Sequence, residues 1–338
     1  MEPVREAEEI SNIAFGYIAS KALFAALHID IFTLLSEGPL PAAAIAAKTS
    51  VPENRITTLV TVLLSLGLLT RADDGFENSP GAASFLAKGA KYDFGDYLRY
   101  QIDRQMFPFM ADLDAVMTGD TAPDAIDSYS KWMADPAQAK LYSDSQHAGS
   151  LGPARGLARM LDLDGAQTML DVAGGTGAFA ITLCQAAPDL TATIVDFPNV
   201  AALGEKYVAT AGLSDRIEFA PGDALHGDWP FERNIVLMSY LLSGVPGDAI
   251  PALVQRAFDA LNPGGRYIVH DFIVDDDRTG PPLTALWQLQ HMTFTPDARS
   301  VTPGWLSSVF SEAGFIDITT DDLIPGMTRV MMARKPGG

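Results

Sequence analysis

The segment 169–180 constrains the fold of this chain more than any other stretch. Its sequence, Met-Leu-Asp-Val-Ala-Gly-Gly-Thr-Gly-Ala-Phe-Ala, runs from apolar residues through Asp171 into Gly174, Gly175 and Gly177. An apolar pattern with helical spacing follows. This order predicts a strand, a tight glycine turn and a helix, which together bring backbone N–H groups and a helix N-terminus against a nucleotide-like ligand.

Two classes of ligand fit such a turn. Residues 175–180 satisfy the pattern G-x-G-x-x-G/A, which is typical of dinucleotide sites. The carboxylate of Asp171, however, would repel a pyrophosphate and would suit a cationic ligand. A nicotinamide enzyme therefore remains an alternative, but Asp171 beside the turn favours a cationic ligand over a dinucleotide.

Two further acids follow apolar segments at corresponding places. Asp196 ends the segment 191–196, with the spacing needed to grip ribose hydroxyls, and Asp223 follows 217–221, where it can accept a hydrogen bond from an adenine amino group. Helix capping would explain either acid taken by itself. Acids at three successive strand ends, together with the glycine turn, instead favour S-adenosylmethionine (SAM), an adenosine that carries an amino acid and a sulfonium.

Residues from about 155 to 335 resemble the class I SAM-dependent methyltransferases. The matching signatures are the glycine turn, Asp-Phe-Pro at 196–198, Gly-Asp-Ala at 222–224 and Leu-Asn-Pro-Gly-Gly-Arg at 261–266. The whole chain resembles the subgroup with an N-terminal dimerisation domain, which plant and bacterial small-molecule O-methyltransferases share, and this implies a homodimer. The predicted SAM site consists of Asp171, Gly174, Gly175, Gly177, Asp196, Phe197, Asp223, Ala224, Ser239 and Tyr240.

Composition narrows the class of protein. The 338 residues carry a formal net charge of −19, which opposes binding to nucleic acid because such binding requires a basic surface. The single cysteine excludes an internal disulfide, and the five histidines lack metal-ligand spacing. The N-terminus is polar and acidic, unlike a signal peptide, and no apolar run is expected to be long enough to span a bilayer. These features predict a cytoplasmic protein that binds no metal, membrane or nucleic acid.

The chain is predicted to have three parts. Residues 1–95 combine helical periodicity with a hairpin at 68–78, which predicts a winged-helix-like dimerisation domain. Residues 96–155 are mainly helical and aromatic, and the corresponding segment roofs the substrate pocket in the resembled family. Residues 156–338 alternate strands and helices, which predicts an α/β fold with a Rossmann-like, doubly wound and mostly parallel sheet.

A winged helix can also bind DNA, which leaves a non-catalytic SAM-binding regulator as an alternative. The helix that would enter the major groove offers only Arg55 as a cation, and the rest of its surface is mostly apolar or threonine. Such a surface favours an isologous interface between two copies of the chain.

The residues at the positions where the resembled family carries its catalytic base and the acids that orient it are unusual. Many O-methyltransferases of the resembled type carry a histidine base after the fourth strand, oriented by acids. Here Ser243 stands near the place of that histidine, Asp271 near the first acid and Ser300 near the second. A thioether has no proton to lose, so alignment with a methyl donor and exclusion of water would suffice for its methylation. The missing base therefore favours transfer to sulfur.

The segment 141–155 resembles the bacterial methylthiohydroxybutyrate S-methyltransferases of dimethylsulfoniopropionate synthesis. That resemblance implies methylation of the thioether of 4-methylthio-2-hydroxybutyrate, a small hydroxy acid. The alternative keeps SAM and changes the acceptor, to give an O- or C-methyltransferase of an aromatic secondary metabolite.

Candidate residues for the acceptor come from the same segment and from later helices. Tyr142 and His147 are the predicted catalytic residues, as donors that position the substrate, and a helix break near Gly149 is expected to let both point inward. A helix-end histidine is an equally good interpretation of His147. His270 is expected to be buried and to face away from the site. The predicted substrate-binding residues are Arg104, which could instead be an exposed helix charge, Ser243, Trp287, His291, which could instead be core, and Met292.

Overall fold

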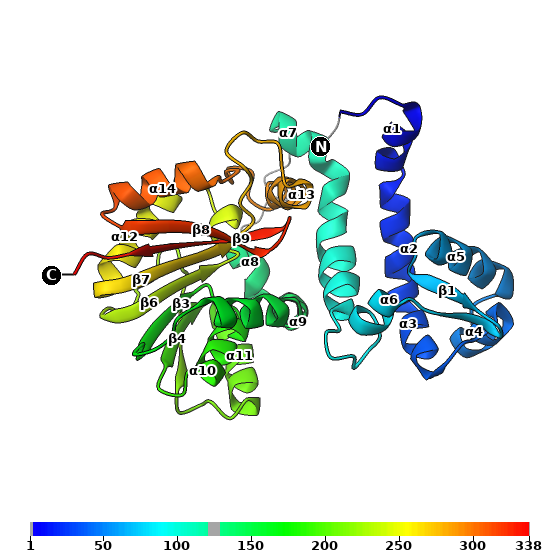
Figure 1. Cartoon of the computed structure of the whole chain (residues 1–338), viewed down its shortest axis with the longest axis horizontal. Helices are drawn as coiled ribbons and strands as arrows, with labels where there is room; N and C mark the ends of the chain where they lie inside the picture. Colours follow the sequence, from blue (N-terminus) through cyan, green and yellow to red (C-terminus); the bar gives the residue numbers. More distant parts are fainter. Residues whose placement is uncertain (1–2, 121–128, 338) are drawn as a thin grey trace. The chain divides into compact units, whose positions relative to one another are not determined.

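The structure is a computed structural model that describes residues 3–120 and 129–337. Its contacts divide the chain into two units, Met1–Phe107 and Pro108–Gly338. The segment 108–155 thus belongs with the sheet-forming unit, whereas the sequence suggested boundaries at 95 and 155. Each unit is described by itself (Figure 1).

The first unit is mainly helical and contains one hairpin. The hairpin predicted at 68–78 is confirmed, since β1 and β2 pair antiparallel. Gly75 adopts φ +146°, and a Cβ there would lie 2.3 Å from the carbonyl carbon of Leu40, so only glycine fits. The elements are α1 Ala7–Ala14, α2 Gly16–His28, α3 Ile31–Leu34, α4 Ala42–Thr49, α5 Glu53–Ser65, β1 Leu69–Ala72, β2 Gly75–Asn78, α6 Pro80–Phe85 and a π-helix Tyr97–Met106.

The stretch Ala7–His28 leaves most of its apolar surface uncovered. Ile13 and Tyr17 are exposed, and only 17% of the most apolar window of this stretch is buried. By length and composition alone it could cross a membrane, so the expectation that no apolar run is long enough was wrong. One such helix is weak evidence for a span, because an uncovered apolar helix also suits an interface between chains.

The second unit contains a sheet of seven strands in the order β5-β4-β3-β6-β7-β9-β8. Pairing is parallel from β5 to β7, while β9 pairs antiparallel with both β7 and β8. This confirms the predicted doubly wound, mostly parallel sheet. The strands are β3 Thr168–Val172, β4 Thr191–Asp196, β5 Ile217–Pro221, β6 Arg233–Ser239, β7 Leu261–Asp271, β8 Ile316–Ile324 and β9 Thr328–Arg334.

Helices cover both faces of this sheet (Figure 1). Alternate residues of β3 point to opposite faces, so Leu170 packs with α12 and α14 while Met169 packs with α9 and α10. The same alternation places Asp171 on the face of Met169. The helices are α7 Leu113–Thr118, α8 Tyr129–Ala134, α9 Pro136–Met160, α10 Ala178–Ala186, α11 Pro198–Thr210, α12 Ile250–Ala260, α13 Pro282–His291 and α14 Pro303–Glu312.

Helix α9 is continuous. Asp135 caps its first turn by accepting hydrogen bonds from the backbone N–H groups of Ala137 and Gln138, and Pro136 suits the first helical position. The helix passes through Gly149 and Pro153 without ending. The break expected near Gly149 was therefore wrong, because tertiary packing along α9 outweighs the low helix propensity of glycine.

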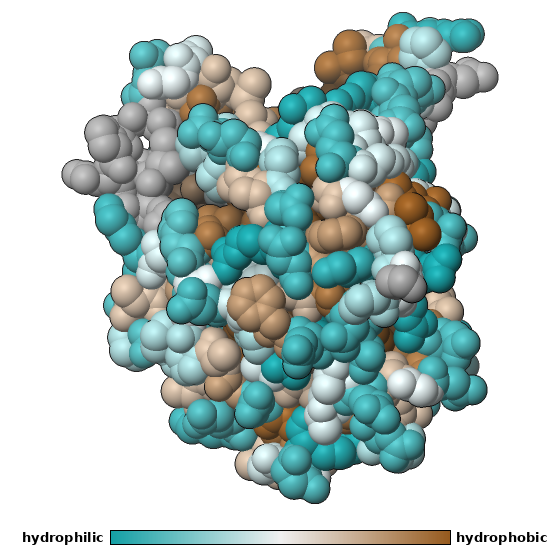
Figure 2. All heavy atoms as spheres, turned by 90° about the vertical axis from the view of Figure 1, so that its left-hand side faces the viewer, coloured by the Kyte–Doolittle hydropathy of each residue, from teal (hydrophilic) through white to brown (hydrophobic). Residues whose placement is uncertain are grey.

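The molecular surface agrees with the charge of the chain. Figure 2 shows a face that is mostly hydrophilic, on which apolar residues occur in small separate groups. A net charge of −19 over 338 residues produces a surface of this kind.

Candidate active site

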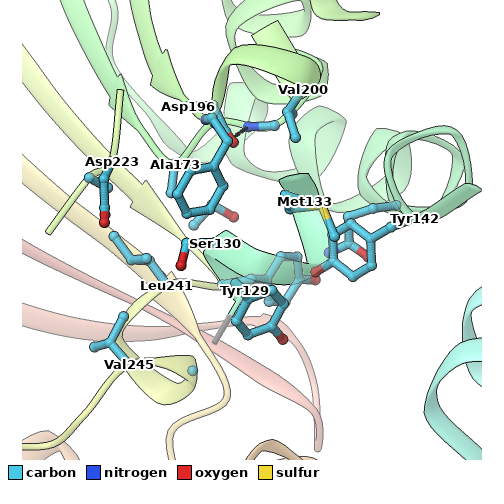
Figure 3. A pocket seen from close by; sticks show the side chains of 18 of the residues that line it. Tyr129, Ser130, Met133, Tyr142, Ala173, Asp196, Val200, Asp223, Leu241 and Val245 are labelled. Atoms are coloured by element: carbon cyan, nitrogen blue, oxygen red, sulfur yellow. Dashed lines mark hydrogen bonds between the residues drawn. The ribbon is translucent and has the colours of Figure 1, made fainter. Parts of the chain in front are cut away.

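A cavity of about 510 Å³ lies where the first strands of the sheet end. Its wall is built from the turns after β3, β4, β5 and β6, from one face of α9, from α8, and from the loop 294–297. Strand order reverses between β3 and its neighbours β4 and β6, which is the place where open α/β sheets bind ligands. In Figure 3, Asp196 and Asp223 lie toward one end of the cavity, and Tyr129 and Tyr142 toward the other.

The glycine turn closes tightly over Asp171. A Cβ on Gly174 would lie 2.5 Å from the carboxyl carbon of Asp171, so a larger residue cannot approach this closely. Gly175 and Gly177 adopt φ of +60° and +85°, which glycine tolerates readily. Gly177 shapes the turn but does not line the cavity, whereas the other predicted SAM residues do line it.

Asp171 is a fully buried acid in the wall of the cavity. Neither of its carboxylate oxygens accepts a hydrogen bond of normal geometry from the described residues. Burial, reinforced by the nearby charge of Asp196 and weakly opposed by the Ala180 N–H, raises the pKa of Asp171 to about 8. A buried carboxyl group of this kind is a ready acceptor for a cationic ligand group.

Asp196 and Asp223 are held by backbone N–H groups. Asp196 Oδ2 accepts from the N–H of Gly175, and Oδ1 from the N–H of Phe197, both at 2.7 Å. Burial raises the pKa of Asp196 to about 6 despite these bonds. Asp223 Oδ1 accepts from the N–H of Leu225 at 2.8 Å. Among the described residues that line the cavity there are acids but no lysine or arginine.

Aromatic rings gather at the opposite end of the cavity. Trp132 stacks on Phe294 with ring centres 5.5 Å apart and planes 9° apart, and Tyr142 meets Trp132 edge-on at 5.1 Å. Tyr129 lies 5.9 Å from Phe294. Burial raises the pKa of Tyr129 to about 12, against a hydrogen bond with Tyr142, so its hydroxyl is neutral at physiological pH. Apart from Trp132, these rings line the cavity.

Helix α9 brings both predicted catalytic residues to the wall of the cavity. Tyr142, Ser143, Gln146 and His147 line it together, at the spacing of one broad helix face, so no break is needed. The Nδ1 atom of His147 lies 2.7 Å from the hydroxyl oxygen of Thr176 in the glycine turn. Burial lowers the pKa of His147 to about 4, so the ring is neutral at pH 7.

The predicted substrate-binding residues do not line the cavity. Ser243 Oγ donates to Asp271 Oδ1 at 2.5 Å, and the carbonyl oxygen of Ser243 lies 3.1 Å from His291 Nδ1. Burial raises the pKa of Asp271 to about 6. Trp287 stacks on Phe272 at 4.8 Å. Ser243, Trp287, His291 and Met292 are thus absent from the cavity wall.

Two other predicted positions also lie elsewhere. Arg104 belongs to the first unit, is 64% exposed and lies 3.8 Å from the carboxylate of Asp103. Ser300, the place of the second expected acid, accepts from Arg278 Nη1 at 2.7 Å. The sequence interpretation of Arg104 as an exposed helix charge therefore fits its surroundings.

Several residues of the cavity carried no signal in the sequence. Tyr129 and Phe294 come from distant segments that only the folded chain brings together. His270 is fully buried as expected, yet its Nδ1 lies 2.9 Å from the hydroxyl of Ser239, which lines the cavity. His270 therefore supports the cavity wall at the end of β6. Its pairing with Ser239 in the parallel strands β6 and β7 is the feature that could have indicated this role.

Comparison with known proteins gives the family. Residues 122–316 match the model of the O-methyltransferase domain, and residues 11–88 match that of the O-methyltransferase dimerisation domain. The chain is 29% identical over 335 residues, 98% of each sequence, to the tetracenomycin polyketide synthesis 8-O-methyl transferase TcmO of Streptomyces glaucescens. It is 28% identical over 312 residues to the 3-hydroxy-5-methyl-1-naphthoate 3-O-methyltransferase of Streptomyces sahachiroi, covering 92% of this chain and 90% of the relative.

The fold is shared with solved structures. Human N-acetylserotonin methyltransferase, solved in complex with SAM, superposes with a TM-score of 0.85 at 23% identity and covers 99% of this chain and 100% of that one. The dimerisation-domain match supports a homodimer. Together with the acids and glycines gathered at the strand ends, the matches show that this chain belongs to the O-methyltransferase family and is a SAM-dependent methyltransferase.

Proposed function

We propose that this methyltransferase transfers a methyl group to an oxygen atom of an uncharged aromatic metabolite. The observation that carries the proposal is the make-up of the cavity wall, which has Asp171, Asp196 and Asp223 after the strands, a group of aromatic rings from α8, α9 and the loop 294–297, and no lysine or arginine among its described lining residues. A carboxylate such as 4-methylthio-2-hydroxybutyrate would lose its hydration there without gaining a cation. Flat rings, in contrast, would contact Phe294 and Tyr129.

The donor end of the cavity has the groups that SAM requires. Asp171, which is buried and accepts no hydrogen bond of normal geometry from the described part of the chain, would accept from the ammonium of its amino acid part. Asp196 would accept from the ribose hydroxyls, and Asp223 with Ala224 would border the adenine. The buried hydroxyl of Ser143, which also lacks a partner among the described residues, would donate to the carboxylate of the amino acid part. When bound, SAM supplies a methyl group on a sulfonium: its S–CH3 bond would break as the acceptor oxygen, held in line with it, bonds the methyl carbon, and the hydroxyl proton of the acceptor would leave to solvent.

The chain itself contributes alignment and exclusion of water. Tyr129, Tyr142 and Phe294 would hold the acceptor ring, and such positioning can lower a barrier by roughly 7–11 kcal/mol. The neutral ring of His147, tied to Thr176, would fix α9 against the glycine turn, so that acceptor and donor are held by one rigid wall. These roles of Tyr142 and His147 are our proposal for the predicted catalytic pair.

Transfer to a thioether sulfur is the second candidate. One observation favours it, because Ser243 occupies the expected place of a histidine base and its hydroxyl is committed to Asp271. The finer resemblance to methylthiohydroxybutyrate S-methyltransferases gains no support from the relatives described above, which are named for transfer to oxygen. We therefore rank it below the aromatic acceptor.

An acceptor screen separates the two candidates. Purified enzyme would be incubated with SAM and either naphthols and other phenols or thioether hydroxy acids, with mass detection of the methylated product. Turnover of phenols with none of thioethers is the expected result. The reverse result would overturn the aromatic proposal, and failure of the protein to bind SAM in calorimetry would overturn both candidates.

The first unit is proposed to form the homodimer, with the helices and hairpin of a winged-helix-like domain. Its uncovered residues Ile10, Ile13 and Tyr17 follow each other at helical spacing, and an apolar stripe on a soluble chain suits an isologous contact. A cytoplasmic location is part of the same proposal, since an interface accounts for the apolar stretch without a membrane.

A further inference from the structure

The turn Asp223–Gly227 forms part of the cavity wall and is held from outside by one guanidinium group. Arg256 on α12 donates from Nη1 to the carbonyl oxygens of Ala224 and Leu225, each at 2.8 Å. Its Nη2 donates to the carbonyl oxygen of Gly227. Arg256 itself does not line the cavity, whereas residues 222–226 do. One side chain therefore binds the outer carbonyls of a turn whose inner side faces the ligand space.

A buried tryptophan completes this arrangement. The guanidinium carbon of Arg256 lies 4.0 Å from the centre of the Trp229 ring, and Trp229 Nε1 donates to the carbonyl oxygen of Ala224 at 3.1 Å. A planar fork that stacks on an aromatic face and binds several carbonyls at once is a property of arginine, which lysine cannot reproduce.

The turn has its own internal restraints, and they depend on the same backbone. The carbonyl oxygen of Asp223 accepts from the N–H of Gly227 at 2.7 Å, and a Cβ on Gly227 would lie 2.9 Å from that oxygen. The Asp223 carboxylate accepts from Leu225. A shift of the outer carbonyls would therefore also move the Asp223 side chain that faces the cavity.

We propose that Arg256 is a positioning residue for the adenine side of the SAM site. By fixing the carbonyls of the turn, it holds Asp223 and Ala224 in the conformation that contacts the ligand. The turn therefore loses less conformational entropy when SAM binds. This inference rests on the proposed assignment of Asp223 and Ala224 to the adenine. The expected effect of Arg256→Lys is a rise in the Kd for SAM of roughly tenfold or more, with kcat at saturating SAM and KM for the acceptor unchanged.

The chain offers a matched control. Arg216 Nη1 donates to backbone carbonyls that include Cys184 at 2.9 Å and Pro188 at 2.8 Å, and neither residue lines the cavity. Arg216→Lys thus removes the same kind of guanidinium–carbonyl contact from a place away from the ligand. It is expected to lower the Tm while leaving the Kd for SAM unchanged. Trp229→Phe, which keeps an aromatic face for the guanidinium but removes the Nε1 donor and part of the ring volume, is expected to weaken SAM binding less than Arg256→Lys.

The test combines calorimetry with hydrogen exchange on the ligand-free protein. Faster exchange of the amides of residues 224–227 in Arg256→Lys, but not in Arg216→Lys, together with the larger Kd for SAM, supports the inference. An unchanged Kd in Arg256→Lys overturns it, and so does an equal rise in both variants, since that would reflect general destabilisation. If the wild-type protein fails to bind SAM, the proposed function itself is overturned, which is a different result from any of these.

Discussion

Asp196 Oδ2 accepts a hydrogen bond of 2.7 Å from the backbone N–H of Gly175, and this bond ties the end of β4 to the glycine turn after β3. Asp196 Oδ1 is held in the same way by the N–H of Phe197. In Asp196→Asn an amide N–H would face one of these backbone N–H groups. We expect the Kd for SAM, measured by calorimetry, to rise by roughly 10- to 100-fold, as for loss of a hydrogen bond to a charged group.

The control for this substitution is the exposed Asp189, which lies in the loop before β4. Asp189→Asn removes the same charge without touching the turn, so the Kd should stay at the wild-type value. Equal affinities for all three proteins would show that Asp196 contributes nothing to the site.

Proton release on SAM binding should reveal the protonation state of Asp171. Since its pKa is raised to about 8 in the ligand-free chain, this carboxyl group is largely protonated at pH 7. An ammonium placed beside it favours the carboxylate, so Asp171 should lose its proton when SAM binds, and affinity should fall as the pH is lowered below 8. Calorimetry at pH 6.5 in buffers of different ionisation enthalpy should therefore show proton release, which Asp171→Asn abolishes. Binding without any proton exchange would contradict the assignment.

The raised pKa of Asp171 should also make the stability of the ligand-free protein depend on pH. A carboxyl group whose pKa rises from 3.8 to about 8 on folding keeps its proton more firmly in the folded state, so its contribution to stability falls as the pH rises through that range. Asp171→Asn has no charge to bury. Its Tm should therefore exceed that of the wild type at pH 9, and the difference should shrink toward pH 5. A difference independent of pH would exclude the buried charge as its cause.

The sequence predicted the residues of the cavity wall that directly follow strands, but it missed the rings that α8 and the loop 294–297 add to that wall, for a physical reason. Asp171, Asp196 and the glycines follow strands directly, so a local strand–turn–helix pattern places them. Tyr129 and Phe294 meet only through tertiary packing, which no local spacing reports. Ser243 stood at the expected position of a base, but its hydroxyl turns to Asp271 rather than lining the cavity.

Helix α9 illustrates the same limit within one element. The sequence placed Tyr142 and His147 near the ligand, and both line the cavity. It also suggested that a break was needed, because spacing alone does not tell how far the cavity wraps around a helix. The bond from His147 to Thr176 depends on the packing of α9 beside the glycine turn and could not be read from either segment.

Phe294 should contribute to binding of the methyl acceptor and not to binding of SAM. It is 4% exposed, lines the cavity and stacks on Trp132. Phe294→Leu keeps an apolar side chain, of smaller volume, but removes an aromatic contact, so kcat/KM for a phenolic acceptor should fall by roughly 3- to 10-fold, as for loss of one aromatic pair. The Kd for SAM should not change. The exposed Phe231 lies outside the cavity wall, and Phe231→Leu should leave both quantities as they are; a fall in SAM affinity at Phe294→Leu would instead indicate a general disturbance of the site.

Ile13 should be needed for association of two chains. Its side chain is 73% exposed in the isolated chain, one turn from Ile10, which is 60% exposed. Burying both against a second copy removes apolar surface from water, at about 25 cal/mol per Å². Ile13→Asp would bury an unpaired charge there, so light scattering after size exclusion should find a dimer for the wild type and a monomer for this variant at micromolar concentration. Phe231→Asp, at a comparably exposed apolar position of the second unit, should remain dimeric, and a dimer in both variants would move the interface away from this stretch.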